Sequence, residues 1–582
     1  MKKYQYLVLP MTFFLLILIA ASCLYVPFLS NSIIFDDHSF FAGLSVYDYA
    51  QVPLSLKPRQ FPYFTLGFIQ VLSGSIEANR IVSLGLHVSI ACLIFLIVRL
   101  LIKDVTAKSD FNDSVSEDYR CNSRTQIISG VCALWFLLNP IAVYGAAYLA
   151  QRTILFATLF ALISLWFYRR AFAENRTADI FTAALFYTMA VFSKEHAIML
   201  PLAAVSLTAL FEGSRRSHFK RILLYLILCL PAAITVLLAS KHIVASSYEP
   251  DVGAMIPQMH EIALLAKPWG KWLLSIILQA GFFFDYLAFW MVPDVRLLSA
   301  DMRFDFVDIW FSWWVFPKAF LFFLSPILAI YFLRKKGLIA FFCCGLLYCW
   351  FLFLTEVAAV RFQEPFVLYR SYLWAPGYVM MMVAVCARFS RRWLVIAAIP
   401  VFAIFFLLAR ERLTSLATEA SVWKDAASKL VSPSLIGSDR IFYNRGRAYL
   451  QEKKYAEAID DFSHTIQQSP RVSQAYYNRA LAYYSLEKYP EAMADLNHAL
   501  LLNENNAYIQ YLRGLVFERR GCVTTAKRAF TASMVLGDQM AKMKLNDLAK
   551  NNPDARKQDQ SLDDAACPAW SSDIPAGTEM SD

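Results

Sequence analysis

Long apolar runs recur through the first part of the chain and alternate with short polar stretches. The first run covers about residues 6–29, and further runs follow at 81–102, 126–145, 153–169, 178–193, 197–212, 221–240, 312–333, 338–357, 373–388 and 393–409. Most of them approach the roughly 20 residues that an α-helix needs to cross a bilayer. The pattern therefore predicts an all-α polytopic membrane domain at residues 1–412 with about eleven transmembrane helices.

Basic residues gather at alternate ends of these runs. When the runs are threaded in order, clusters such as Arg169-Arg170 fall on the side of the N-terminus, which the positive-inside rule assigns to the cytoplasm. The opposite, extracytoplasmic face then receives two long segments, 30–80 and 241–311, and everything after the last run. Residues 262–292 are apolar enough for one more crossing, but a single crossing there would invert the later basic clusters. We interpret them as helices lying at, or re-entering, the outer interface.

The composition changes after residue 412, where Ala, Tyr and alternating charges replace the apolar runs. After a linker at 413–438, comparison of the chain with itself at a lag of 34 residues aligns three blocks within 439–541. Small residues at the eighth and twentieth positions and aromatic residues at other fixed positions recur, which is the pattern of tetratricopeptide repeats. We predict an α-solenoid of three repeats. Residues 551–582 are polar, with Pro, Ser and Asp, and are predicted to be disordered.

Tetratricopeptide repeats have no chemistry of their own and hold an extended peptide or a partner helix. Polar side chains recur one repeat apart on the first helix of each pair, where they are candidates for binding a peptide backbone or a carboxylate. An equally weighted interpretation makes them structural or solvated helix residues. The candidates are Asn444, Arg445, Asn478, Arg479 and Arg513.

The composition is typical of a membrane protein. The chain of 582 residues is 58% hydrophobic and 17% charged, against roughly 45–50% and about 25% in soluble domains, which excludes a single soluble globular domain. The net charge of +10 is largely explained by the basic clusters on the side of the N-terminus, so no nucleic-acid partner is required. Most of the eleven cysteines lie inside apolar runs without zinc-ligand spacing.

Two adjacent carboxylates, Asp36 and Asp37, stand directly after the first apolar run. Ionisable groups at the membrane edge are costly unless they are paired or functional. One of them is a candidate general base that takes the proton from an acceptor hydroxyl, while its neighbour positions the acceptor or a metal ion. The alternative is that both cap the segment that follows. The ligand spacing in the sequence indicates no metal site, and a requirement for a divalent metal stays open.

Cations at the outer ends of the runs oppose the positive-inside bias and need another explanation. Arg152, Lys194 and Arg370 are candidates for holding the phosphate of a lipid-linked donor, whose headgroup lies at this depth. Lys194 has an alternative role in a compensating pair with the residue after it, and a histidine inside the second run more often forms a hydrogen bond between helices. The supporting polar residues of this edge are Arg59, His87, Gln151, Glu195 and Glu364.

Together these landmarks resemble the transmembrane and tetratricopeptide-repeat protein O-mannosyltransferases and their bacterial relatives, in the GT-C class of glycosyltransferases. The resemblance covers nearly the whole chain, and it depends on the order of short motifs rather than on any one of them. The motifs are Asp36-Asp37, Arg59, His87, Asn139-Pro140, Gln151-Arg152, Ser193-Lys194-Glu195, Leu264 to Trp269, Tyr369 to Leu373 and the repeats.

The resemblance implies an enzyme that moves a sugar from a polyprenyl-phosphate carrier to Ser or Thr hydroxyls outside the cytoplasm, with inversion at the anomeric carbon. It assigns the base to the Asp36-Asp37 pair and the donor phosphate to the three outer cations. Two departures leave the sugar open. Asn139 replaces a His that the family often has before Pro140, and Leu368 stands where a Glu often precedes the last outer motif.

The Met-Lys-Lys start, the absence of an endoplasmic-reticulum retention signal and the small number of repeats predict a bacterial inner-membrane protein. We expect an undecaprenyl-linked donor and periplasmic repeats that recruit an exported acceptor protein such as a type IV pilin. One alternative keeps the fold but transfers sugar to a glycan or lipid, where a peptide-binding module has no evident use. Another is a non-enzymatic membrane anchor that displays the repeats as a scaffold, which leaves the outer-edge charges unexplained.

Overall fold

The computed structural model describes residues 2–52, 55, 57–106, 115–240, 255–335 and 337–550. Every regular element in these ranges is helical, which confirms the all-α prediction. The chain divides into two compact units, Met1–Asp425 and Ala426–Asp582. The predicted disordered tail, 551–582, lies outside the described residues, as does the beginning of the 241–311 segment.

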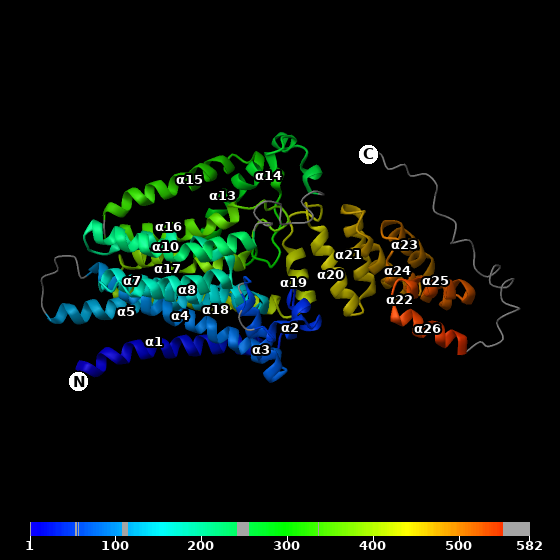
Figure 1. Ribbon diagram of the computed structural model, residues 1–582, viewed down its shortest axis with the longest axis horizontal. Helices are drawn as coiled ribbons and strands as arrows, with labels where there is room; N and C mark the ends of the chain where they lie inside the picture. The colour runs from blue at the N-terminus through cyan, green and yellow to red at the C-terminus, as the bar shows by residue number, and fades with distance from the viewer. Residues whose placement is uncertain are drawn as a thin grey trace. The chain divides into compact units, whose positions relative to one another are not determined.

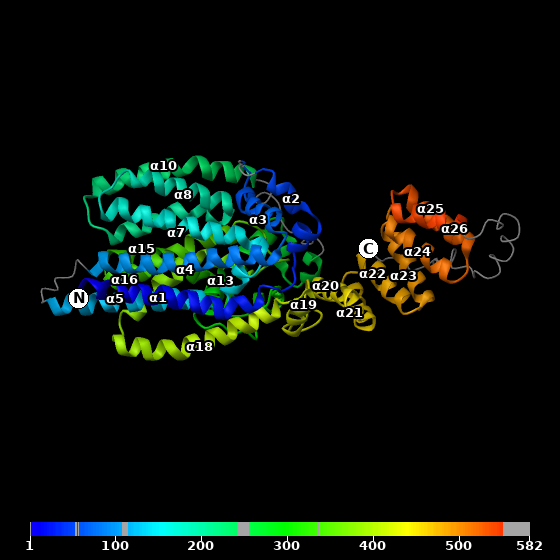
Figure 2. The same cartoon turned by 90° about the horizontal axis from the view of Figure 1, so that it is seen from below.

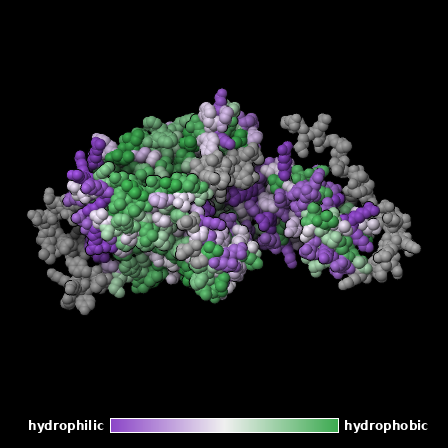
Figure 3. Space-filling model, in the orientation of Figure 1, coloured by the Kyte–Doolittle hydropathy of each residue, from purple (hydrophilic) through white to green (hydrophobic). Residues whose placement is uncertain are grey.

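Long helices run side by side in the first unit (Figures 1 and 2). In the described part of the chain, eight helices are long and apolar enough to cross a membrane by length and composition. Apolar side chains cover a broad part of the face of this unit seen in Figure 3. The eight helices are α1 (Lys2–Tyr25), α4 (Ile76–Thr106), α7 (Arg152–Ala173), α10 (Arg215–Ala239), α13 (Gly270–Met291), α15 (Val315–Phe332), α16 (Gly337–Val357) and α18 (Arg391–Ser415).

The predicted number of eleven spanning helices is not confirmed, because several apolar runs are broken in the structure. The run 126–145 ends as a helix at Leu138, before Asn139-Pro140, since a residue that precedes proline is driven away from the helical conformation. The run 197–212 is divided into three short helices. The other helices of this region are α5 (Val115–Leu138), whose apolar part is limited to Ser123–Leu138, α6 (Ala142–Ala146), α8 (Asp179–Ser193), η4 (Glu195–Met199), α9 (Leu200–Leu207), η5 (Thr208–Leu210) and α17 (Ala375–Cys386).

Helix α13 is a continuous helix within the segment predicted to lie at the outer interface. Near its start, Ser275 donates a hydrogen bond of 3.3 Å to the carbonyl of Ala359, just after α16. Near its end, Trp290 donates one of 2.8 Å to Ser371, and Asn139 donates one of 3.0 Å to the Trp290 carbonyl. Both ends therefore contact turns that the threading assigns to the same face. The length of α13 also suits a crossing, so the interfacial placement stays a prediction.

The segment 30–80 folds into short helices against the ends of the long ones. It contains η2 (His38–Ala42), α2 (Ser45–Ala50) and α3 (Gln60–Ser73). Gly67 lets α2 and α3 touch, because a Cβ at this position would lie 2.2 Å from the carbonyl oxygen of Val46.

Close packing of α16 against α17 fixes the turn between them. A Cβ on Gly345 would lie 2.5 Å from the carbonyl oxygen of Gly377, and a Cβ on Gly377 would lie 2.6 Å from that of Gly345. Such paired small residues allow two helix backbones to approach. The segment between α16 and α17 contains η9 (Leu368–Trp374), which leads directly into α17.

The second unit is a stack of helix pairs with one helix at its end. The pairs have the period predicted from the sequence, and α26 covers the last pair, as a terminal helix of a solenoid does. Helix α19 (Glu419–Ser428) lies inside the predicted linker and includes the end of the first unit and the beginning of the second. The helices are α20 (Asp439–Gln451), α21 (Tyr455–Gln468), α22 (Ser473–Ser485), α23 (Tyr489–Leu502), α24 (Ala507–Arg519), α25 (Val523–Val535) and α26 (Gln539–Lys550).

Small residues at the eighth position of each repeat allow its two helices to approach. A Cβ on Gly446 would lie 2.9 Å from the ring of Phe462, and a Cβ on Gly514 would lie 2.4 Å from the ring of Phe530. Ala480 fills the same position in the second repeat and is fully buried. The small residues of the repeat pattern therefore stand where the two helices of each repeat pack closely.

Candidate active site

The two predicted carboxylates follow a strained residue beyond the end of α1. Phe35 has a φ of 51°, a left-handed conformation that is uncommon for residues other than glycine. Its ring lies 5.6 Å from the ring of Tyr148 and 5.1 Å from that of Trp423, centroid to centroid. These contacts hold the backbone so that the Asp36 side chain is exposed and the Asp37 side chain is buried.

Asp37 holds the turn at the start of α7. Its carboxylate accepts hydrogen bonds from the backbone N–H groups of Leu149 and Ala150, at 3.3 and 2.7 Å. These residues form η3 (Leu149–Gln151), which leads into α7. Burial raises the pKa of the Asp37 carboxyl to about 7, although the two N–H groups act in the opposite direction. Asp37 therefore holds the backbone turn before α7, which is closer to the capping alternative than to the predicted positioning of an acceptor or a metal ion.

Asp36 presents the accessible carboxylate of the pair. Its backbone N–H donates a hydrogen bond of 3.1 Å to the hydroxyl of Tyr148, and its carbonyl accepts one of 2.7 Å from Ser39. These two bonds fix the backbone and leave the carboxylate oxygens without a hydrogen bond or ion pair from the described residues. An accessible carboxylate on a fixed backbone suits a general base.

Lys194 is a buried cation in the turn between α8 and η4. Its ammonium nitrogen lies 5.7 Å from the centroid of the Tyr369 ring, and it has no ion pair within the described part of the chain. Burial, together with the nearby charge of Arg59, lowers the pKa of Lys194 to about 7. Glu195, the expected compensating partner, instead accepts two hydrogen bonds from Arg59, one of them 3.0 Å long. The alternative in which Lys194 pairs with Glu195 is therefore not what the structure shows.

Two tyrosines connect the backbone of Asp36 to the buried cation of Lys194. The Tyr148 hydroxyl accepts from Asp36, the Tyr148 and Tyr369 rings lie 6.2 Å apart, and Tyr369 lies against Lys194. Residues from four distant parts of the sequence thus form one continuous set of contacts.

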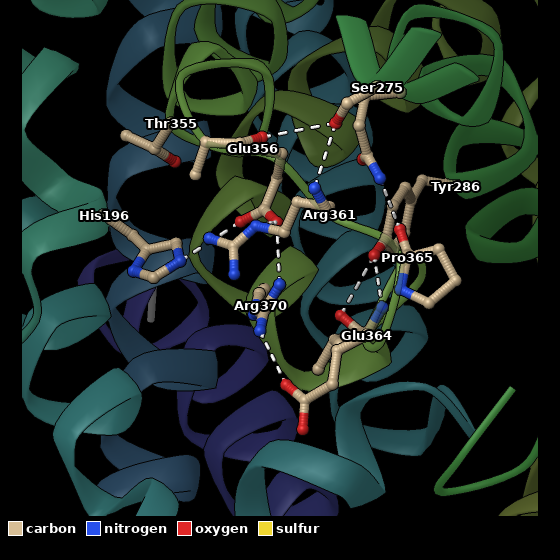
Figure 4. A network of polar contacts seen from close by, with 12 residues as sticks. His196, Ser275, Tyr286, Thr355, Glu356, Arg361, Glu364, Pro365 and Arg370 are labelled. Atoms are coloured by element: carbon tan, nitrogen blue, oxygen red, sulfur yellow. Dashed lines mark hydrogen bonds and ion pairs between the residues drawn. The ribbon is translucent and has the colours of Figure 1, made fainter. Parts of the chain in front are cut away.

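A network of ion pairs lies beside this set and is centred on Glu356, at the end of α16 (Figure 4). The fully buried Glu356 carboxylate accepts a hydrogen bond of 2.9 Å from Arg370 and lies 3.1 Å from His196 and 3.5 Å from Arg361. Arg370 also donates one of 3.0 Å to Glu364. Because the guanidinium of Arg370 contacts two carboxylates, its charge is already compensated.

The network reaches the Arg59 pair through His196, whose Nδ1 atom lies 3.5 Å from Glu195. When Lys194 is counted with this network and the histidine is neutral, the cations outnumber the carboxylates by one. The three arginines have carboxylate partners, so the extra positive charge is that of Lys194. The cations are Arg59, Lys194, Arg361 and Arg370, and the carboxylates are Glu195, Glu356 and Glu364.

Arg152 is fully buried and does not contact a carboxylate among the described residues. Its guanidinium donates to Ser83 at 3.2 Å, to Thr65 at 3.4 Å and to the carbonyl of Asn79. It therefore joins α7 to α3 and α4, and its charge acts on the site through space rather than by contact. The neighbouring Gln151 is also buried, and its Oε1 atom has no hydrogen-bond partner in the described structure.

His87 lies among the long helices. Its Nδ1 atom is 2.6 Å from the hydroxyl of Tyr372, and its Nε2 atom is 3.3 Å from the carbonyl of Leu137 and 3.4 Å from the hydroxyl of Tyr25. These contacts agree with the alternative in which His87 forms hydrogen bonds between helices rather than supporting the site.

Several residues of the site were not predicted. Glu356 and Arg361 belong to the network together with His196, and both stand at an outer end of an apolar run, the same signal that selected the predicted residues. Arg80 holds the segment after α1 through its bonds to the carbonyls of Leu29, at 2.7 Å, and of Ser32, at 2.8 Å, and to that of Asn31. Arg412 is bound by Asp425 at 2.9 and 3.0 Å.

The repeat candidates mostly contact their own unit. Arg445 pairs with Asp461 and Arg479 with Asp495. Asn444 donates to the Arg440 carbonyl at 2.9 Å, and Asn478 donates to the Tyr443 hydroxyl at 3.2 Å. These contacts favour the structural interpretation for four of the five candidates. The exception is Arg513, which has no carboxylate partner among the described residues.

No group of three or more His, Cys, Asp or Glu side chains is arranged to hold a metal ion within the described ranges. The exposed Asp36 carboxylate is the nearest feature to a metal ligand at the site, and one carboxylate alone does not define such a centre.

Comparisons with known proteins identify the repeats. The family models for the tetratricopeptide repeat match residues 439–471 and 473–506, so the C-terminal unit contains tetratricopeptide repeats. No curated protein matches the chain.

Three solved structures are similar to parts of the chain. The first repeat domain of Spaghetti (RPAP3), bound to the HSP90 peptide SRMEEVD, is 25% identical over 20% of this chain and 93% of its own, with a TM-score of 0.19. The Arabidopsis OM64 repeat domain is 23% identical over 19% and 95%, also with a TM-score of 0.19. The Cut9-Hcn1 hetero-tetramer of the APC/C is 13% identical over 87% and 92%, with a TM-score of 0.22.

Proposed function

We propose that the chain is a membrane glycosyltransferase of the GT-C class. It transfers a sugar from a polyprenyl-phosphate-linked donor to a Ser or Thr hydroxyl of an exported protein. The observation that carries this proposal is a set of contacts between two charged residues: the backbone of Asp36, whose carboxylate is exposed, bonds Tyr148, and Tyr148 packs on Tyr369, which lies against the unpaired cation of Lys194. An inert membrane anchor has no need for this arrangement.

In the proposed reaction, Asp36 accepts the proton of the acceptor hydroxyl as its oxygen attacks the anomeric carbon. The bond from that carbon to the carrier phosphate breaks with inversion, and the phosphate leaves with the bonding electrons. Lys194 stabilises the charge on the leaving phosphate, as a fixed cation in a dry site does. Arg370 and Arg361 hold Glu356, which keeps the turn of Tyr369 against Lys194.

The charge pattern supports an extracytoplasmic position for this site. Basic clusters such as Arg215-Arg216 and Arg391-Arg392 stand at the opposite ends of the helices, as the positive-inside rule expects for a cytoplasmic face. We infer an inner-membrane enzyme with a cytoplasmic N-terminus and periplasmic repeats.

The repeats recruit the acceptor in this proposal, because stacked helix pairs bind extended peptides without any chemistry of their own. A glycan or lipid acceptor makes no use of such a module. The acceptor protein, a type IV pilin or another exported protein, is held near the membrane surface where the lipid-linked sugar is displayed.

The proposal is tested by intact-mass spectrometry of exported proteins from a strain that lacks the chain and from its parent. We expect at least one exported protein to lose a mass that corresponds to one or more sugars, and the mass to return when the wild-type chain is restored. Identical masses for all exported proteins in both strains would exclude a protein acceptor.

A further inference from the structure

The three repeats share an arginine at one position, but only the first two repeats neutralise it. Arg445 pairs with Asp461 through two hydrogen bonds of 2.8 and 2.6 Å. Arg479 pairs with Asp495 through two of 2.8 and 2.7 Å. Each aspartate stands 16 positions after its arginine, on the second helix of the same repeat. The equivalent position of the third repeat holds Ala529.

The arginine of the third repeat has also lost an aromatic neighbour. In the first two repeats the guanidinium lies over a ring three residues earlier, 5.3 Å from Phe442 and 5.9 Å from Tyr476. The third repeat has Gln510 at this position, and Arg513 donates to its Oε1 atom at 3.2 Å. The Nε atom of Arg513 is buried and has no hydrogen-bond partner in the described structure.

The charge of Arg513 is therefore less stabilised than that of its two equivalents. The hydrogen bond to Asp461 raises the pKa of Arg445, whereas burial lowers the pKa of Arg513. The side chain is only partly buried, so a ligand can reach it from solvent. The third repeat therefore has the arginine but lacks both the aspartate and the aromatic ring that contact it in the other two repeats.

We propose that Arg513, together with Gln510, binds a carboxylate of a peptide ligand in the place that an aspartate occupies in the other two repeats. A guanidinium binds a carboxylate through two parallel hydrogen bonds, which makes it selective for an acid over the corresponding amide. The carboxylate comes from an acidic side chain of a bound peptide or from the chain's own residues after Lys550, which include Asp563 and Asp564. This inference concerns binding alone and goes beyond the proposed transfer reaction.

The test uses the full chain in nanodiscs and two fluorescein-labelled peptides with amidated ends. Their sequences are Gly-Ser-Asp-Asp-Gly and Gly-Ser-Asn-Asn-Gly, so that they differ only in acid against amide side chains. We expect the acidic peptide to bind about fivefold more tightly, the upper range for one solvent-accessible ion pair. Arg513→Gln removes the preference. Ala529→Asp supplies the missing carboxylate from within and also removes it, whereas Ala529→Asn, of matched size and no charge, keeps it.

A chain that ends at Lys550 distinguishes the two sources. A preference seen only in this shortened chain supports the site and assigns its occupant to the chain's own C-terminal residues. Equal binding of both peptides by the full and the shortened chain overturns the proposal, and so does a preference that survives in Arg513→Gln. Since no sugar is transferred in this assay, its failure leaves the proposed reaction untouched.

Discussion

Donor binding should weaken as the pH rises, because Lys194 must be protonated to hold a phosphate. Burial lowers the pKa of Lys194 to about 7. A basic group with a lowered pKa is charged below that value and loses its charge above it. If only the protonated form binds, the apparent Kd is proportional to one plus the ratio of neutral to charged lysine. With a pKa of about 7, the apparent Kd therefore increases about tenfold between pH 6 and pH 8.

The assay is equilibrium binding of a short-chain fluorescent polyprenyl phosphodiester to the full chain in nanodiscs of neutral lipid. A phosphodiester keeps one negative charge throughout this range, so the titration reports the protein. Lys194→Arg should change by less than about twofold across the range, because a guanidinium stays charged. Lys194→Met should bind roughly 10- to 100-fold more weakly at pH 6, as expected for a lost hydrogen bond to a charged group.

Lys57→Met is the matched control, because Lys57 is an exposed lysine of the 30–80 segment. It should keep the affinity and the pH dependence of the wild type. A wild-type Kd that is constant from pH 6 to pH 8 would show that protonation of Lys194 does not control donor binding. A tenfold change that persists in Lys194→Arg would show that another group titrates.

Three further predictions concern the supporting structure. Asp37→Asn leaves one of two backbone N–H groups without a good acceptor and should lower the free energy of unfolding by about 1–3 kcal/mol. The control, Asp48→Asn at an exposed position, should change the free energy of unfolding little. Equal thermal melts for Asp37→Asn and the wild type would contradict the prediction. Glu356→Gln removes the carboxylate shared by His196 and Arg370 and should reduce transfer at least about tenfold, with unchanged activity as the refuting result. Deletion of 439–541 should reduce acceptor use but not phosphodiester binding, and acceptor modification at the full rate would exclude recruitment by the repeats.

The repeats could be predicted closely because their signal is local and occurs three times. A small residue at the eighth position and an aromatic ring on the second helix have to meet wherever two such helices pack, and Gly446 with Phe462 and Gly514 with Phe530 do so. The long apolar helices are similarly evident from composition. The number of spans was harder to predict, because hydropathy averages over breaks such as that at Asn139-Pro140.

The site could be predicted only as a set of residue types at one edge of the helices. The motif order selected Asp36, Lys194 and Arg370, but it did not show which charges neutralise each other. Pairing depends on tertiary contacts, as when Arg59 takes Glu195 and leaves Lys194 alone. The division between an exposed Asp36 and a buried Asp37 likewise depends on the left-handed backbone at Phe35.

The most direct test of the account is the mass of the acceptor protein produced with Asp36→Asn. This substitution keeps the size of the side chain and the hydrogen bond from its backbone to Tyr148, but it removes the proton acceptor. We expect the variant to insert into the membrane, to bind the phosphodiester with wild-type affinity and to leave the acceptor without its sugar mass. An acceptor that carries its full sugar mass in cells with Asp36→Asn would show that Asp36 is not the base.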